Sequence, residues 1–182
     1  IIRFFRIEII HTIPSAFLLS AFFIMGISAW HLLKKQHIEF FTRSFNIALV
    51  VGLVSSLIVV LTGDMHAVHV TKTQPSKLAA MESHWETQTQ APIVLFAIPD
   101  EANERNAIEI GSLPGVLSFL GHHDFNAQIT GLKDIPRDER PPVLPTFISF
   151  RTMVALGTLF PLLMIAGLFL RKRLLESRWY LW

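Results

Sequence analysis

The chain has 182 residues, of which 51% are hydrophobic and only 16% are charged. This balance excludes an ordinary soluble domain and is typical of membrane proteins. Cysteine is absent, so neither disulfides nor a thiolate metal cluster is expected, and a metal would have to use His, Met or carboxylate ligands.

The first predicted element is a transmembrane helix over residues 1–33. Residues 9–33 contain no Asp, Glu, Lys or Arg, and about 20 apolar residues suffice to cross the hydrocarbon layer. Pro14 lacks an N–H for the Ile10 carbonyl, so the helix either begins near His11 or kinks there. The chain starts without an initiator methionine or a signal-peptide pattern, and we expect it to be an excerpt from a longer protein.

Two further spans are predicted, separated by a short link and a long polar segment. Residues 44–62 are free of charged residues, and residues 143–170 are apolar except for Arg151. The predicted parts between and after them are a link at 34–43, a loop at 63–142 and a tail at 171–182. The expected fold class is therefore all-α integral membrane, with three transmembrane helices plus a long, partly helical extracytoplasmic loop.

The orientation follows from basic residues in short flanks, because Lys and Arg near helix ends are retained on the cytoplasmic side. The link and the tail carry such residues: Lys34, Lys35, Arg43, Arg171, Lys172, Arg173 and Arg178. This places both inside and the loop outside. The loop has eleven acidic and six basic residues, a net charge of about −5, so no nucleic-acid partner is expected.

Two side chains of the spans can ligate a metal. His11 lies near the start of the first helix and Met153 near the start of the third, and these helices run in the same direction. With a rise of about 1.5 Å per residue, both fall at similar depth and could hold one haem between them. Such a haem is six-coordinate and carries electrons rather than oxygen. The alternative is a hydrogen-bonding histidine and a methionine that fills a packing gap.

The loop contains a short run of helix-forming and charged residues. Residues 77–88 read KLAAMESHWETQ, and good helix formers after Pro75 predict a short helix at the membrane surface. In this run Glu82 can accept a proton and Lys77 can donate a hydrogen bond. Five positions apart, they differ by about 140° on a helix, too far for simple pairing. The alternative is a solvated charged face that includes Glu86.

The chain resembles subunit I of the cytochrome bd oxidases. The resemblance is carried by Lys77–Gln88, Gly131-Leu132-Lys133, Arg140-Pro141-Pro142-Val143 and Phe150-Arg151-Thr152-Met153. It implies that His11 and Met153 are the axial ligands of a low-spin haem b, and that Lys77 and Glu82 act in quinol binding and oxidation. Arg151 would then either contact a haem propionate or anchor the helix at the outer interface. Ala67 departs from a family pattern that has glycine there.

The resemblance also implies what lies outside this chain. In the complete enzyme, electrons pass on to a high-spin haem b and haem d, whose ligands are not in this sequence, so this chain alone should not reduce oxygen. The implied partners are membrane lipid, the rest of subunit I, a second membrane subunit and ubiquinol or menaquinol. The implied location is a bacterial or archaeal cytoplasmic membrane, with the loop on the outer side.

Two other functions remain open at this point. The chain could be a quinone-binding cytochrome b subunit of a dehydrogenase, or a non-enzymatic membrane receptor or scaffold whose loop binds a partner. The loop histidines are expected to be solvated or structural, since no HExxH pattern supports zinc. Asp64 is expected to cap or hydrate the outer end of the second helix.

Overall fold

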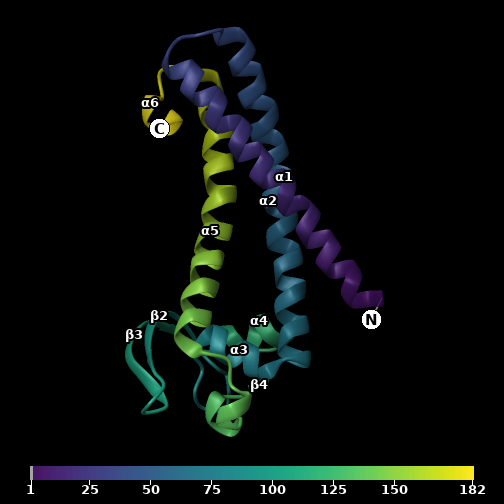
Figure 1. Cartoon of the computed structure of the whole chain (residues 1–182), viewed down its shortest axis with the longest axis vertical. Helices are drawn as coiled ribbons and strands as arrows, with labels where there is room; N and C mark the ends of the chain where they lie inside the picture. Colours follow the sequence, from purple (N-terminus) through teal and green to yellow (C-terminus); the bar gives the residue numbers. More distant parts are fainter. Residues whose placement is uncertain (1) are drawn as a thin grey trace. The chain divides into compact units, whose positions relative to one another are not determined.

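The computed structural model describes the backbone of residues 2–182 and the side chains from Glu8 onward. Three long helices dominate it: α1 (Ile2–Leu33), α2 (Ile38–Thr73) and α5 (Val143–Leu170) (Figure 1). The shorter elements are α3 (Pro75–Glu82), β1 (Gln88–Thr89), β2 (Ile93–Asp100), β3 (Arg105–Leu113), α4 (Val116–His122), β4 (Gln128–Ile129), the 3₁₀ turns η1 (Leu132–Asp134), η2 (Arg137–Glu139) and η3 (Arg171–Arg173), and α6 (Arg178–Leu181).

Each long helix includes a stretch that is long and apolar enough to cross a membrane. These stretches are Glu8–Leu33, Ile38–Thr73 and Arg137–Arg173, the last of which includes short turns on either side of α5. The prediction of three long apolar helices is therefore confirmed; residue 1 lies outside the described residues. The ends of α5 match the predicted 143–170.

Helix α2 is longer than the span predicted at 44–62. It begins at Ile38, inside the predicted link, and continues through Gly63 and Asp64 to Thr73. The helix ends there because Pro75 disfavours helical geometry at the residue before it, and Gln74 accordingly has φ −141° and ψ 63°. Asp64 is thus inside a helix, and the expectation that it caps a helix end was wrong.

Helix α1 continues without interruption through Pro14. The alternative in which the helix begins near His11 is therefore excluded. The Ser15 hydroxyl donates a hydrogen bond of 2.7 Å to the His11 carbonyl, within the same turn of the helix as the proline.

The chain forms two compact units. One contains the described residues up to Gly63 together with Leu156–Trp182, and the other is Asp64–Ala155. The core of the first unit includes Leu32, Phe45, Leu49 and Met164, each 2% exposed or less. Gly52 permits close packing there, because a Cβ at that position would lie 2.6 Å from the Met164 Cε.

The second unit contains β-structure that the all-α prediction missed. Strands β2 and β3 form an antiparallel hairpin in which Phe96 pairs with Ile110 and Ile98 with Ile108 (Figure 1). A second antiparallel pair joins β1 to β4. The fold is therefore mostly helical with two small sheets. Residues 93–98 are rich in β-branched and aromatic side chains, which favour a strand, and the turn before Arg105 lets the chain return.

The short helix α3 is packed into the core of the second unit. Ala79 and Ala80 are fully buried with Trp85, Leu132 and Val143, which brings α3, η1 and the start of α5 together. The opposite flank of α3 contributes Leu78 to a cluster with Leu117 and Ile129 of α4 and β4. Helix α3 is held on several sides, so its side chains have defined directions.

Candidate functional site

The helix that carries Lys77 and Glu82 has sharply defined ends. Pro75 is its first residue, a position where the missing N–H costs no helical hydrogen bond. Its last residue is Glu82, because Ser83 adopts a left-handed conformation with φ 51° and ψ 42°. The N–H of His84 then bonds to the Ala79 carbonyl at 2.8 Å and closes the helix end. Glu82 is therefore held one residue before a fixed turn.

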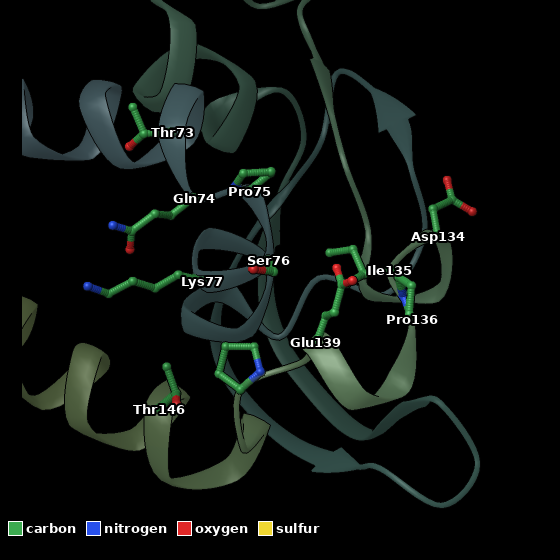
Figure 2. A pocket seen from close by; sticks show the side chains of 11 residues that line it. Thr73, Gln74, Pro75, Ser76, Lys77, Asp134, Ile135, Pro136, Glu139 and Thr146 are labelled. Carbon is green, nitrogen blue, oxygen red and sulfur yellow. The ribbon is translucent and has the colours of Figure 1, made fainter.

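Lys77 is exposed and lines a cavity of about 690 Å³. Figure 2 shows its side chain extending in the same direction as that of Gln74, with Thr146 of α5 nearby. The other lining residues come from the end of α2, the start of α3, the η1–η2 segment and the start of α5: Thr73, Pro75, Ser76, Asp134, Ile135, Pro136, Glu139 and Pro141. A cavity of this size is in the range that holds a small organic molecule.

Glu82 is not among the residues that line this cavity, and it is buried. Its Oε2 accepts a hydrogen bond from Arg151 Nη2 at 2.5 Å, which joins α3 to α5. The side chains of Glu82 and Arg151 are 4% and 16% exposed, so the ion pair is largely removed from water. Such a pair needs good geometry, because both charges lose their hydration.

Burial raises the pKa of Glu82 to about 7, and the charge of Arg151 and its hydrogen bond act in the opposite direction. At neutral pH the carboxyl group is then close to half-ionised. A carboxyl group with a pKa near the working pH can accept a proton and release it again.

Arg151 is stabilised by a second contact besides Glu82. Its guanidinium lies 5.1 Å from the ring centroid of Phe147, which is 1% exposed and packs against Val94 and Ala97 of β2. Within the described residues its Nε is buried without a hydrogen-bond partner. From the sequence we expected Arg151 either to contact a haem propionate or to anchor the helix at the membrane interface. Its ion pair with Glu82 was not predicted.

The structure does not bring Lys77 and Glu82 to one point. Lys77 lines the cavity, whereas Glu82 is absent from its lining and pairs with Arg151. This agrees with the angular separation expected on a helix. Lys77 therefore lies at the cavity and Glu82 in a buried ion pair, so the two residues can have different chemical roles.

The neighbouring charged residues of the loop have other partners. Glu86 forms an ion pair with Lys133 of η1. Asp64 lies 3.1 Å from the His123 Nε2, just after α4. His84 is buried, and burial lowers its pKa, while Glu109 and Glu86 act against that shift.

His11 is oriented by Thr62, which faces it from α2. The His11 Nδ1 and the Thr62 Oγ1 are 2.8 Å apart. The Thr62 hydroxyl has a single hydrogen, which it donates to the Ile58 carbonyl at 2.8 Å. Its oxygen must then accept the hydrogen of Nδ1. Metal-binding histidines typically have one ring N–H held in this way.

Met153 lies on α5 with its side chain 57% exposed. It belongs to the second compact unit, whereas His11 belongs to the first. The sharing of one iron by these two residues stays a prediction.

These features define a membrane protein with three candidate spans and a folded segment between the second and the third. The whole of residues 2–182 matches the family of cytochrome bd terminal oxidase subunit I. The chain belongs to this family. Members of the family use haems, which agrees with the coarse expectation drawn from the resemblance.

Individual relatives agree with this assignment. The chain is 41% identical over 187 aligned positions to cytochrome bd ubiquinol oxidase subunit 1 of Bacillus subtilis, covering 96% of this chain and 40% of that protein. A putative cytochrome bd menaquinol oxidase subunit I of the same organism is 35% identical, with 94% and 39% covered. The solved bd oxidase of Geobacillus thermodenitrificans matches with a TM-score of 0.81 and 28% identity, covering 97% of this chain and 43% of that one. The chain thus spans about two fifths of the length of these relatives.

Proposed function

We propose that this chain supplies the quinol-oxidising part of a cytochrome bd-type oxidase, with Glu82 as the acceptor of a quinol proton. The observation that carries the proposal is the buried Glu82–Arg151 pair and the pKa of about 7 that burial gives to Glu82. A carboxylate in water, with a pKa near 4, would be a much weaker base toward a phenol.

Arg151 keeps part of the Glu82 population ionised, because its positive charge and its hydrogen bond both favour the carboxylate. It also fixes one carboxylate oxygen, so the other is directed by the rigid end of α3. The two residues together hold a base that is ionised often enough to react and basic enough to take the proton.

We assign Lys77 to binding rather than to proton transfer. Lys77 is among the residues that line the cavity, and an ammonium group can donate a hydrogen bond to a quinol oxygen and attract a developing negative charge. Glu82 and Lys77 then act on the substrate from different surroundings, and their substitution should affect different kinetic constants.

His11 and Met153 are proposed to hold the low-spin haem b. The His11 imidazole, the Thr62 oxygen that orients it, and the exposed Met153 thioether fit the donor set of such a haem. When bound, this haem would accept electrons one at a time from the quinol.

The remaining parts of the proposal come from the family. They are electron transfer to a high-spin haem b and haem d elsewhere in the complete subunit, a second membrane subunit, and the placement of the loop outside the cytoplasmic membrane. The comparisons favour an oxidase over the dehydrogenase subunit and the scaffold, because the relatives named above are bd-type oxidases.

The decisive experiment uses the assembled oxidase and compares Glu82→Gln with Glu86→Gln. Glu86 follows shortly after the end of α3 and is exposed, so it is a matched control. Removing a general base typically costs about 10²- to 10⁴-fold in rate. We expect Glu82→Gln to lose at least about 100-fold in kcat for quinol oxidation, and Glu86→Gln to retain it. Parent-like turnover in Glu82→Gln would refute the proposed role.

A further inference from the structure

Asn106, on strand β3, is a hydrogen-bonding centre that no sequence motif suggested. Its Oδ1 accepts from the Ser83 hydroxyl at 2.5 Å and from the Trp85 indole N–H at 2.9 Å. Its Nδ2 donates to the Ser83 carbonyl at 3.0 Å and to Glu109 Oε1 at 2.6 Å. All four hydrogen-bonding positions of the amide are used.

The orientation of this amide is determined by its partners. The indole N–H of Trp85 can only donate, so an oxygen must face it, and the Ser83 carbonyl can only accept, so the NH₂ group must face that. Three of the four bonds go to Ser83 and Trp85, which are buried and directly follow α3.

Ser83 is the residue that most needs such support. It adopts a left-handed backbone conformation with φ 51°, which is unfavourable for residues other than glycine. Asn106 binds both its hydroxyl and its carbonyl, and thereby holds the turn immediately after Glu82. The direction of the Glu82 side chain depends on that turn.

The same hairpin also holds the beginning of α5. Glu101, in the turn between β2 and β3, accepts hydrogen bonds from the backbone N–H groups of Val143 and Leu144 at 3.1 and 3.2 Å. These N–H groups begin α5 and have no partner within the helix, so Glu101 acts as a remote N-cap. Glu104 accepts a hydrogen bond of 2.7 Å from Arg140 Nη1, three residues before the helix.

The turn end of this one hairpin therefore contacts both the residues that follow α3 and the start of α5. A register shift at Ile98/Pro99 adjusts the hairpin just where Asn106 pairs with Pro99. We propose that Asn106 is a positioning residue that sets the place of Glu82 against Arg151, with the β2–β3 hairpin as the brace between α3 and α5. The functional consequence rests on the proposed role of Glu82 as proton acceptor.

The test is made on the assembled oxidase, with Asn106→Ala and the control Asn103→Ala. Asn103 lies in the turn of the same hairpin, but its side chain bonds only to Asp100 among the described residues. Misplacing a reacting group by about 1 Å can cost about 100-fold in rate. We expect Asn106→Ala to lower kcat for a soluble short-chain quinol about 10- to 100-fold while KM changes less than about threefold, and Asn103→Ala to match the parent.

A second measurement reports the position of Glu82 without turnover. The infrared carboxyl band of Glu82 is identified by its loss in Glu82→Gln, and its frequency depends on the hydrogen bonds of that carboxyl group. Asn106→Ala should shift this band and Asn103→Ala should not. If Asn106→Ala does not assemble, Asn106→Asp, which keeps the acceptor for Trp85 and loses the donor to Ser83, is judged by the same two criteria.

The two proposals fail in different ways. An unchanged kcat and an unchanged Glu82 band in the Asn106 variant would overturn the positioning role, even if Glu82→Gln is inactive. A parent-like turnover in Glu82→Gln would instead overturn the role of Glu82 as proton acceptor, while a shifted band in Asn106→Ala would still support the brace.

Discussion

Arg151 Nη2 lies 2.5 Å from Glu82 Oε2, and this contact joins residues that are 69 positions apart in the chain. One partner comes from the only helical segment within the KLAAMESHWETQ run, and the other from the start of an apolar helix. The pair therefore links the loop to a candidate span. A change at Arg151 in α5 should alter the pKa of Glu82 in α3.

The pH dependence of quinol oxidation should report Glu82. Only its ionised form accepts a proton, and its pKa is raised to about 7, so kcat/KM should fall as the pH decreases through about 7. The decrease should approach tenfold per pH unit on the acid side. Glu82→Gln should remove this acidic limb of the pH profile, that is, the fall of kcat/KM below about pH 7. Steady-state rates measured from pH 5 to 9 would test this. A limb near pH 4.5 in the parent enzyme would contradict the assignment.

Replacing Arg151 with methionine should move that limb to higher pH. Arg151 lowers the pKa of Glu82 through its charge and its hydrogen bond, so its loss leaves burial unopposed and the pKa of Glu82 rises. Turnover at pH 7 should then decrease, and partly recover at pH 9. Arg43→Met, which removes an exposed arginine paired with Glu39, is the control and should leave the pH profile unchanged. An acid-shifted limb in Arg151→Met would be inconsistent with the ion pair.

Lys77→Gln should raise KM for quinol more than it lowers kcat. Lys77 lines the cavity but is not in contact with the buried pair, so its loss weakens binding and leaves the base intact. A charged hydrogen bond contributes about 1.5–3 kcal/mol, which corresponds to roughly a 10- to 150-fold change in KM. Lys72→Gln removes an exposed lysine outside the cavity lining and should retain the parent KM. A pure kcat effect in Lys77→Gln would argue against a binding role.

Thr62→Val should weaken the proposed low-spin haem site. The Thr62 oxygen holds the Nδ1 hydrogen of His11 and so directs Nε2, and loss of such a partner typically costs about 10- to 100-fold in metal affinity or activity. Reduced-minus-oxidised spectra and the midpoint potential of the b-type haem are the measurements. Ser56→Ala, which removes a hydroxyl of the same helix bonded to the Leu53 carbonyl, is the control. An unaltered spectrum and potential in Thr62→Val would exclude this role of the threonine.

Sequence reasoning was most successful where one local property decided the structure. The apolar runs of α1 and α5 were identified because an uninterrupted stretch of about 20 apolar residues has few alternatives to a membrane-spanning helix. The short helix α3 was anticipated from Pro75 and the helix formers after it. The family was identified from residue runs that the comparisons then confirmed.

The misses share one physical cause, which is that the deciding partner is distant in the sequence. The content of β-branched and aromatic residues in 93–98 was a usable signal for a strand, but pairing with β3 was needed to stabilise it. The part of α2 beyond Gly63 packs against a segment distant in the sequence, because a Cβ at Gly121 would lie 3.0 Å from the Thr71 Oγ1. No local sequence pattern indicated the hydrogen-bonding role of Asn106, because asparagine is common in polar loops.

By itself the sequence determined the number of long apolar helices, the presence of a charged short helix between them, and the residue types available for proton and electron chemistry. These properties follow from hydrophobicity and helix propensity, which act over neighbouring residues. Only the tertiary structure decided that Glu82 is buried against Arg151, that Lys77 lines a cavity instead, and that Asn106 contacts the turn after Glu82. Burial and pairing depend on which distant segments come together, and that information is held in packing rather than in any single stretch of the chain.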